Sequence, residues 1–390
     1  MTSVGATIEQ LLAAKEIVVV CGSGGVGKTS TAAALATMAA ADLGGKVLVL
    51  TVDPARRLAA AMGLAGLGNV ETRVGPEAFA GAGIEPRGEL WAAMLDTEQS
   101  WDDLVRRHAP DAATAAAILA NPLYRNVAGR FVQSHDYIAM ERLYELHTSG
   151  VYDLIVVDTP PTRHALDFLE APERMADFFS SRLLRWLLAP YRSRLINVAS
   201  RPFYQVADRV LGTAFLRDIA EFFMLFQSMY DGFVERARAV ERVLEDRRTT
   251  FVVVTTLESS PAYEARRFVE VLAARHLHLG ALVLNRVLPS ELLDPASAEV
   301  ARQMSARSDV VAAEVLARRP DVADDLGHLA RVLEELGDSF LNFQVVAKRE
   351  AEQRAELGIG ADVVASVPSL PTDIFDLTGV VRLGEHLRRA

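Results

Sequence analysis

The chain has 390 residues, enough to bury a large core, and its 50% hydrophobic and 24% charged residues are typical of a folded globular protein. A net charge of -10 and an isoelectric point near 5.4 disfavour nucleic acid as the main partner. The single cysteine, Cys21, allows neither an internal disulfide nor a cysteine-based metal cluster, which fits a reducing compartment. We expect Cys21 to be a small, buried, apolar residue at the end of a strand.

No targeting or membrane-spanning segment is predicted. The first ten residues lack a basic segment followed by an apolar core, which a secretory signal requires. The most apolar helical stretch, residues 183–190, is interrupted by arginine and proline and is too short to span a bilayer. We therefore expect a cytoplasmic protein, and peripheral association with the inner face of the membrane stays an open alternative.

The first motif lies between an apolar run and a helix-forming segment. Residues 16–21 are rich in β-branched side chains and predict a buried parallel strand. Residues 22–30, GSGGVGKTS, match the G-x-x-x-x-G-K-[ST] pattern in full, and residues 31–40 favour a helix. Strand, glycine loop and helix in this order predict a phosphate-binding loop. The alternative, a glycine-rich turn without a ligand, is disfavoured by the complete pattern.

The residue types explain the expected chemistry. Glycines let consecutive backbone N–H groups point at a phosphate, and the helix N-terminus adds partial positive charge. Lys28 would reach the β- and γ-phosphates of ATP, and the Thr29 hydroxyl would ligate Mg²⁺. The predicted nucleotide contacts of the loop are consecutive: Gly22, Ser23, Gly24, Gly25, Val26, Gly27, Lys28, Thr29 and Ser30.

A second strand is predicted over residues 46–52 and ends at Asp53. Ligands of doubly wound sheets gather at the carboxyl ends of the strands, so Asp53 should face the phosphates. There it could activate the attacking water or hold Mg²⁺ through water. Because Asp53-Pro54 is also a good helix start, an N-cap role is equally compatible with this segment.

A third strand is predicted over residues 152–157, followed by Asp158. An apolar strand that ends in aspartate is the usual Mg²⁺-side partner of a phosphate loop. The pattern is weak evidence alone and becomes strong evidence when it accompanies such a loop. Residues 159–163, Thr-Pro-Pro-Thr-Arg, predict a stiff segment that could sense the γ-phosphate. His164 is interpreted as a hydrogen-bonded residue at a helix start in preference to a nucleotide contact.

Further strands are predicted at residues 251–255, 281–284 and 363–367. Together the predicted strands make an α/β fold, a largely parallel and doubly wound sheet covered by helices. No internal repeat and no low-complexity linker divides the chain, so residues 1–390 are expected to form a single domain of the P-loop NTPase type.

Long helical stretches are predicted between the strands. Those over about residues 90–147 and 163–248 would form an inserted helical subdomain, and a charged helical insertion is predicted over about 291–358. The charges of the last stretch are interpreted as a solvated helical face.

The motifs as a set resemble one family. Residues 22–29, 51–58, 158–169 and 367–371 occur in the order seen in the arsenite-pump ATPases and the ATPases of the guided-entry pathway for tail-anchored membrane proteins. The resemblance extends from about residue 16 to about 387. Within the family the chain is most similar to an actinobacterial branch in which two unlike subunits occur together. The resemblance implies an ATP-driven dimer that opens and closes around nucleotide.

The resemblance also implies roles for individual residues. Asp53 would lie in a first switch and activate the water, and the Asp158 carboxylate would act on Mg²⁺ through water. Asn285 would read the adenine edge, for which its amide offers both a donor and an acceptor, and Pro368 would lie against the base. The expected catalytic residues are thus Lys28, Asp53 and Asp158, and the expected metal residues are Thr29, Asp53 and Asp158.

Three departures from the family pattern matter. Ser23 stands where the family has a lysine that reaches the partner's nucleotide, so the isolated chain is expected to be a slow ATPase or to pair with a lysine-bearing paralogue. With Cys21 alone, neither a thiolate site for arsenite nor a Cys-x-x-Cys zinc clamp can exist. Arg163 replaces a glycine and would either block the γ-phosphate or contact it through its guanidinium.

Residues 178–188 and 215–226 carry many large apolar side chains. In the family, helices of the insertion build a groove for a hydrophobic segment, and these residues could supply one. They could instead form the core of the helical subdomain, which is the favoured interpretation for each residue taken singly.

The favoured function is an ATPase subunit whose dimer handles a hydrophobic or tail-anchored membrane client. Its expected ligands are ATP and Mg²⁺, and its expected partners are a paralogous subunit or a second copy, together with the client or a membrane partner. One alternative is a slow or inactive nucleotide-gated regulatory half of a heterodimer, and another is the motor subunit of an anion or metal efflux system.

Overall fold

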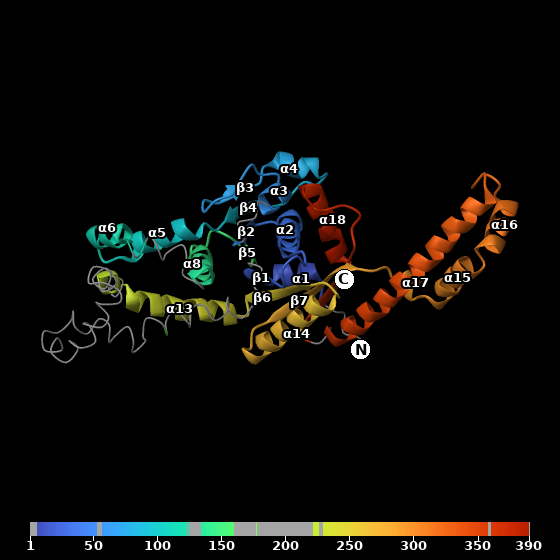
Figure 1. The fold of residues 1–390 in the computed structure, drawn as a ribbon. Coiled ribbons are helices and arrows are strands. Elements are labelled where there is room, and N and C mark those ends of the chain that lie inside the picture. The colour runs from blue at the N-terminus through green and yellow to red at the C-terminus, as the bar shows by residue number, and fades with distance from the viewer. Residues whose placement is uncertain are drawn as a thin grey trace.

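The computed structural model describes residues 6–52, 57–122, 124, 134–159, 177, 221–225, 229–357 and 360–389. Its centre is an eight-stranded sheet in the order β3-β4-β2-β5-β1-β6-β7-β8, with helices on both faces (Figure 1). Every neighbouring pair of strands is parallel except β3 and β4, which are antiparallel. The expected α/β fold of the P-loop type is confirmed.

The strands follow the sequence order. Their bounds are β1 (Ile17–Cys21), β2 (Lys46–Thr51), β3 (Thr72–Arg73), β4 (Glu89–Met94), β5 (Leu154–Asp158), β6 (Thr249–Thr255), β7 (Leu279–Val287) and β8 (Val363–Pro368). All six strands that the sequence predicts are present.

The described helices include one π-helical and one 3-10 segment, labelled η1 and η2. Their bounds are α1 (Ile8–Ala13), α2 (Lys28–Met38), η1 (Ala39–Leu43), α3 (Arg57–Ala61), α4 (Pro76–Gly81), α5 (Thr97–His108), α6 (Ala112–Ala120), α8 (Ser134–Thr148), α13 (Tyr230–Glu245), α14 (Ser259–Ala274), η2 (Ser290–Leu293), α15 (Pro295–Ala306), α16 (Ser308–Arg318), α17 (Leu326–Leu357) and α18 (Leu377–Arg388).

The start of the first predicted helical stretch, at about residue 90, is wrong. Residues 89–94 form β4, which pairs in parallel register with β2 along its whole length. The segment contains alanine, leucine and methionine, which favour helices, and pairing within the sheet overrides that preference. The helices of this stretch begin at Thr97, where the Asp96 carboxylate caps α5 by accepting a bond from the Gln99 backbone N–H at 3.0 Å.

Both faces of the sheet are buried, and alternate residues of the central strands point to opposite faces. In β1, Ile17 and Val19 contribute to one core, together with side chains of α5, α8, α13 and α14. Val18 and Val20 contribute to the other core, with side chains of α1, α2 and α18. Burial on both sides explains why the central strands read as uninterrupted apolar runs.

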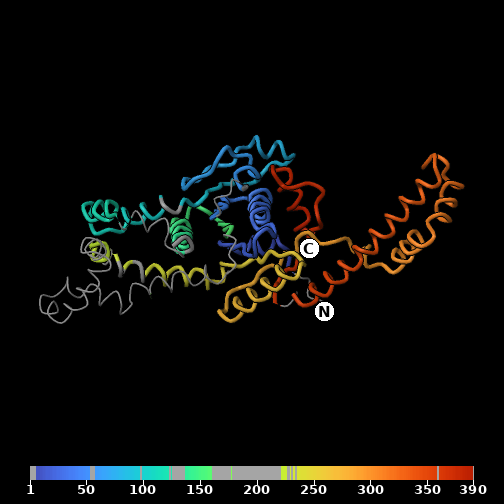
Figure 2. Tube along the Cα trace, in the orientation of Figure 1, coloured from blue at the N-terminus to red at the C-terminus, as the bar shows by residue number. Residues whose placement is uncertain are grey.

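The first and last helices lie side by side on one face of the sheet. Arg388 Nε of α18 lies 3.0 Å from Glu9 Oε1 of α1, so the two ends of the described chain are neighbours (Figure 2). The absence of a side chain at Gly384 lets α18 approach α2, because a Cβ there would lie 2.9 Å from Met38 Cγ. These contacts support the helix that follows the phosphate loop.

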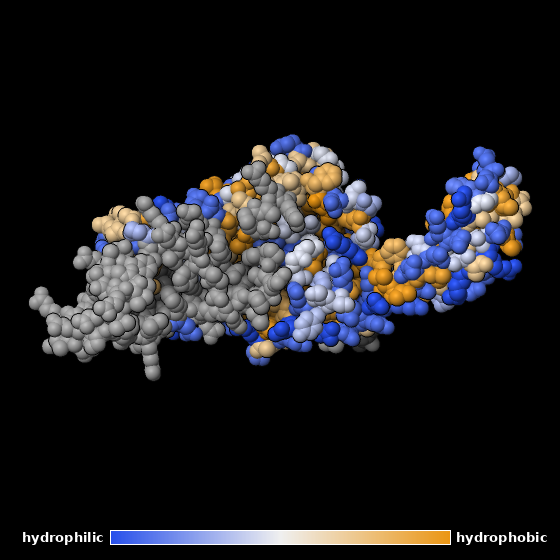
Figure 3. Space-filling model, in the orientation of Figure 1, coloured by the Kyte–Doolittle hydropathy of each residue, from blue (hydrophilic) through white to orange (hydrophobic). Residues whose placement is uncertain are grey.

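Residues 290–357, here called the arm, project away from the sheet (Figure 1, Figure 3). In the arm, α15 and α16 lead outward and the 32-residue helix α17 returns. A small separate core, formed by Ala312, Leu329, Ala330 and Leu333, holds the tip together. Within the charged helical insertion predicted over about 291–358, residues 295–306, 308–318 and 326–357 are helical.

The base of α17 is tied to the sheet. Glu350 Oε2 accepts a hydrogen bond from the Leu288 backbone N–H at 3.0 Å, just after β7. Glu356 pairs with Arg266 of α14 at 2.9 Å, and Leu357 is buried in the core. The arm is thus a continuation of the folded core and not a loosely linked module.

The second predicted helical stretch, about residues 163–248, is described only at residues 177, 221–225 and 229–248. The last of these ranges contains α13. Within the described parts of the chain, no helix combines the length and the apolar character needed to cross a membrane.

A close helix–helix approach in the arm yields a stability prediction. A Cβ at Gly337 of α17 would lie 2.6 Å from the Ala301 carbonyl oxygen and 2.8 Å from the Ser305 nitrogen, both in α15. Gly337→Ala should therefore lower the free energy of unfolding by about 1–3 kcal/mol through overpacking. The measurement is chemical unfolding, combined with hydrogen exchange of α15 and α17.

Gly327→Ala is the matched control, because the nearest atom to its Cβ, Asp325 Oδ1, would lie at an ordinary contact distance of 3.7 Å. This variant should be neutral or slightly more stable, since alanine favours a helix over glycine. Equal destabilisation by both substitutions would contradict the packing argument.

Candidate nucleotide-binding site

The glycine loop connects β1, in the middle of the sheet, to α2. Two of its glycines are held by close contacts. A Cβ at Gly22 would lie 2.1 Å from the Val254 carbonyl oxygen of β6, and one at Gly27 would lie 2.4 Å from Asn285 Nδ2. Gly27 precedes α2 with a φ of 100°, in the left-handed region that favours glycine. The tight loop predicted from the sequence is present.

Lys28 and Thr29 begin α2. The Lys28 side chain is buried and folds back over the loop, where its Nζ donates to the Ser23 carbonyl oxygen at 2.9 Å. Thr29 Oγ1 donates to Asp158 Oδ2 at 2.7 Å. A helix N-terminus, a lysine ammonium and a threonine hydroxyl therefore lie together beside the loop, which is the donor set that a bound polyphosphate requires.

Asp158 is fully buried at the carboxyl end of β5, between β1 and β2. In the register of the sheet it pairs with Val20 of β1 and with Thr51 of β2. Thr51 Oγ1 donates to Asp158 Oδ2 at 2.9 Å, so one carboxylate oxygen accepts bonds from two threonines. Hydroxyl and carboxylate oxygens are the ligands that Mg²⁺ prefers, and Thr29 with Asp158 fits that ion.

Cys21 is a structural residue, as expected. It is buried at the end of β1, and burial raises the pKa of its thiol to about 12. Nearby, Thr159 Oγ1 donates a hydrogen bond to the carbonyl oxygen of Val20, the residue before Cys21, at 2.9 Å. The thiol therefore stays protonated and unreactive at neutral pH.

Asn285 comes from β7 and contacts the loop directly. Its Nδ2 donates to the Val26 carbonyl oxygen at 2.8 Å, and its Oδ1 accepts from the Arg286 N–H at 3.0 Å. The pairing of β7 with β8 shifts register here, and Arg286 has a φ of 58°. This bulge turns the Asn285 amide toward the phosphate loop.

Pro368 is exposed at the end of β8 and pairs with Val287 of β7. The structure thus brings Asn285 and Pro368 to the ends of neighbouring strands. Sequence reasoning missed the bond from Asn285 to the loop and the bond from Thr51 to Asp158. The position of Thr51 at the end of the strand before Asp53 was a sequence signal for the bond to Asp158.

The Ser23 side chain is not accessible to a second subunit. Its Oγ is buried and makes no hydrogen bond to any residue that the structure describes. A buried hydroxyl at this position cannot carry positive charge to a nucleotide in another subunit. The geometry at Ser23 agrees with the departure noted in the sequence.

Several predicted site residues lie outside the described part of the chain. They are Asp53, Arg163 and His164, together with residues 178–188. Of residues 215–226, the described ones are 221–225. There, Phe222 is buried with its ring centroid 6.5 Å from that of Tyr124, whereas Met224 is exposed.

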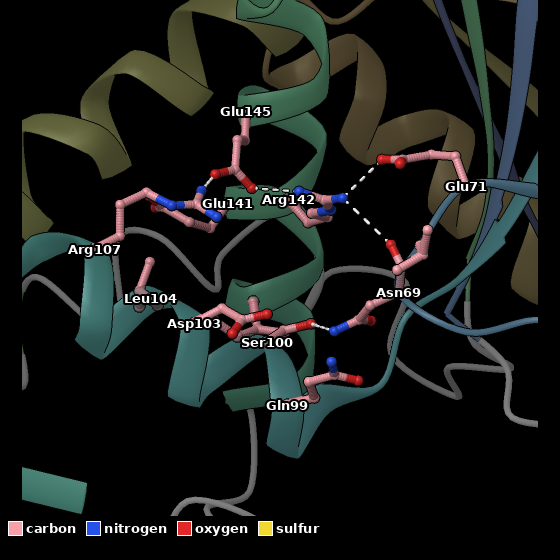
Figure 4. A pocket seen from close by; sticks show the side chains of 12 residues that line it. Asn69, Glu71, Gln99, Ser100, Asp103, Leu104, Arg107, Glu141, Arg142 and Glu145 are labelled. Carbon is pink, nitrogen blue, oxygen red and sulfur yellow. Dashed lines mark hydrogen bonds and ion pairs between the residues drawn. The ribbon is translucent and has the colours of Figure 1, made fainter.

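A separate polar cavity of about 190 Å³ lies between α5, α8 and residues 69–71 (Figure 4). Arg142 crosses it and pairs with Glu71 and Glu145, each at 2.7 Å. Asn69 Nδ2 donates to Ser100 Oγ at 2.9 Å on its other side. The cavity is smaller than a site for a drug-sized ligand, and its charged lining groups already take part in ion pairs.

A buried ion pair lies beside this cavity and joins α8 to α13. Glu141 accepts a bond from the Tyr137 hydroxyl at 3.0 Å, and Arg236 Nε lies 2.5 Å from Glu141 Oε1. Burial raises the pKa of Glu141, and the Arg236 charge opposes that rise. Burial, together with the charges of Arg236 and Arg107, lowers the pKa of His108 to about 4. Three helices therefore meet around one buried charge pair.

The first prediction from this site concerns Thr51. Thr51→Val keeps the shape but removes the hydroxyl that donates to Asp158, and a bond to a charged group contributes about 1.5 kcal/mol or more. The affinity for Mg²⁺-ATP should fall about tenfold. Titration with Mg²⁺ at a fixed concentration of a fluorescent ATP analogue measures this change.

Thr51→Ser, which keeps the hydroxyl, should retain most of the affinity. If Thr51→Val bound Mg²⁺-ATP as tightly as the unaltered chain, the orienting role of Thr51 would be disproved.

The second prediction concerns His108. Its folded-state pKa of about 4 lies below the ordinary value of 6.5, so between these pH values the unfolded chain binds more protons. This residue therefore makes stability rise with pH from about 4 to 6.5, whereas the raised pKa of Glu141 acts with the opposite sign. In His108→Gln, the unfolding midpoint should rise less steeply with pH across this window. A midpoint that depends on pH in the same way in the variant and in the unaltered chain would contradict the prediction.

Comparison with known proteins agrees with the geometry. The sequence profile of the anion-transporting (ArsA) ATPase family matches residues 15–313. An uncharacterized protein of Streptomyces coelicolor is 32% identical over 322 residues, which cover 80% of this chain and 74% of the relative. An ATPase ASNA1 homolog of Entamoeba dispar is 24% identical over 278 residues, covering 70% of this chain and 76% of the relative.

ATPase GET3 of Malassezia globosa is 25% identical over 267 residues, which cover 68% of this chain and 71% of that protein. The family profile spans the phosphate loop, Asp158 and Asn285, the residues that the fold gathers around the end of β1. The chain therefore belongs to the anion-transporting ATPase family, and its resemblance to the arsenite-pump and guided-entry ATPases is confirmed.

Proposed function

We propose that this chain binds Mg²⁺-ATP at the loop of residues 22–30 and hydrolyses it, as a subunit of a dimer that opens and closes with the nucleotide. One observation carries the proposal. Lys28 and Thr29 begin the helix after the loop, and Thr29 is bonded to the buried Asp158 at 2.7 Å, on the strand beside β1. This arrangement suits phosphoryl transfer, in which positioning and charge stabilisation do most of the work.

The residues divide the chemistry between them. Lys28 would neutralise charge on the β- and γ-phosphates, and Thr29 with Asp158 would hold Mg²⁺, which supplies Lewis-acid stabilisation of the phosphate oxygens when bound. Thr51 holds the Asp158 carboxylate in place. Asp53, which follows β2, would accept a proton from the water that attacks the γ-phosphate.

Asn285 and Pro368 would bind the adenine. The Asn285 amide donates one N–H to the Val26 carbonyl oxygen and accepts the Arg286 N–H at one lone pair of its oxygen. A second N–H and a second lone pair of the same amide are left to bind the base. Because the same amide is bonded to the phosphate loop, base binding and loop geometry would be coupled through this side chain.

Ser23 supports a second candidate. Its buried hydroxyl cannot replace the lysine that acts across the dimer, so the chain would be a slow or inactive regulatory half of a heterodimer with a lysine-bearing paralogue. The two candidates share the nucleotide site and differ in turnover.

The proposed client is a hydrophobic or tail-anchored membrane protein, handled in the cytoplasm by a helical subdomain within residues 90–147 and 163–248. The exposed Met224 beside the buried Phe222 fits a layer with both a core and an apolar surface. The efflux-motor alternative stays a prediction. Among the described residues, no group of three or more His, Cys, Asp or Glu side chains is placed to hold a metal ion.

The proposal predicts ATP hydrolysis that depends on protein concentration. Turnover per chain should rise with concentration, because a dimer is needed, and Lys28→Ala should abolish it. Asp53→Asn should keep ATP binding and lose turnover. Steady-state phosphate release and nucleotide binding measure both, and turnover that persists in Asp53→Asn would refute the role of Asp53.

A gain-of-function variant separates the two candidates. If the missing lysine limits the rate, Ser23→Lys should raise turnover at least tenfold, whereas Ser23→Met, of similar bulk without charge, should not. Measurable ATP binding with no turnover above the Lys28→Ala blank in the unaltered chain would favour the regulatory subunit.

A further inference from the structure

Helix α17 carries a line of apolar side chains that the arm does not bury. Val332, Leu336, Phe343 and Val346 are 38%, 56%, 51% and 46% exposed. Four large apolar side chains in one line on a single helix exceed the scattered exposure that is normal for a surface.

The spacing of these residues is that of a coiled-coil seam. Residues 332, 336, 339, 343 and 346 alternate steps of four and three, which places them at successive d and a positions of a heptad. Ser339 occupies the middle position and is exposed. We call these five residues the α17 seam. Such a line suits packing against another helix of the same kind.

The arm packs a different side of α17. Leu333, Gly337 and Ala347 are buried, and the first belongs to the small core shared with α16. They lie on one flank of the seam. The seam is therefore a second apolar face, beside the one that the fold already uses.

The other flank of the seam carries an ordered set of polar residues. Glu335, Asn342 and Arg349 follow one another at intervals of seven and are all exposed. The two charges are opposite in sign and lie equally far from Asn342. A helix that runs antiparallel to an identical one presents this flank in reversed order, so each glutamate meets an arginine.

We propose that a second copy of this chain packs on the α17 seam, with the two helices antiparallel and related by a two-fold axis close to Leu341 and Asn342. Leu336 then faces the second copy's Val346, and Ser339 faces the second copy's Phe343. Glu335 pairs with the second copy's Arg349. A two-fold axis makes every such contact twice, which is the commonest symmetry of homo-oligomers.

This pairing is independent of the nucleotide site. The seam contains none of the residues at the phosphate loop, so arm-to-arm association should occur without ATP and persist in Lys28→Ala. Only a short stretch of each helix is covered, and the interface therefore belongs to the small, weak class. The inference stands whether or not the chain hydrolyses ATP.

The first test uses two adjacent valines of similar exposure. Val346 lies in the seam, whereas Val345 is 52% exposed and lies outside it. Sedimentation velocity of the full chain without nucleotide, in the Lys28→Ala background, should show reversible dimers. Val346→Ser should weaken dimerisation about tenfold or more, because the contact is lost twice, and Val345→Ser should leave it unchanged.

The second test exchanges the charges. Glu335→Arg or Arg349→Glu alone should weaken dimerisation, because each creates like-charge pairs across the axis. The double variant should restore it, since every pair is again of opposite sign. The restoration is specific for the antiparallel register and would not follow from a general loss of solubility.

A third test locates the axis. Asn342→Cys should be joined between copies by a short bis-maleimide, whereas Lys348→Cys, which is exposed and lies about 120° around α17 from Asn342, should not. The native Cys21 does not interfere, because it is buried and its pKa is raised to about 12. A chain that stays monomeric at about 100 µM, or dimers that Val346→Ser and Val345→Ser affect equally, would overturn the proposal.

An apolar seam could also be occupied by another protein or by lipid. Binding of the Lys28→Ala chain to vesicles of anionic lipid, weakened by Val346→Ser while no self-association is seen, would likewise overturn the second copy as the occupant.

Discussion

The buried carboxylate of Asp158 is the constraint around which the site is arranged. It lies on β5 between the strand that carries the phosphate loop and the strand that ends in Thr51, and one of its oxygens accepts bonds from Thr29 and Thr51. Three parallel strands must be in register to within one residue for this to occur. A shift by one residue would turn Asp158 to the other face of the sheet and separate it from α2.

The fold was predictable where a local pattern coincided with the global arrangement. The central strands are apolar on both faces and could be recognised as buried parallel strands from composition alone. β4 could not, because Trp91, Ala92 and Ala93 form a strand through their pairing with β2 and β3, and the same composition is compatible with a helix. The two-residue strand β3 leaves no periodic signal at all.

The site was predictable to the extent that its chemistry is local. The loop motif identified Lys28 and Thr29, and the strand-end pattern identified Asp158. The contact of Asn285 with Val26 joins residues that are 259 positions apart. It depends on a bulge in the pairing of β7 with β8, which no sequence pattern predicts. Long-range hydrogen bonds of this kind depend on the register of neighbouring strands, which single-sequence reasoning does not provide.

The length of α17 has a mechanical consequence. A helix of 32 residues extends about 48 Å, and its base is joined to the end of β7 through Glu350 and to α14 through Glu356. Such a helix acts as a stiff lever. If the part of the sheet that carries β7 and α14 turned by about 10°, the far end would travel about 8 Å, several times the displacement near the pivot. Small rearrangements around Asn285, at the end of β7, would thus become large movements at the tip of the arm.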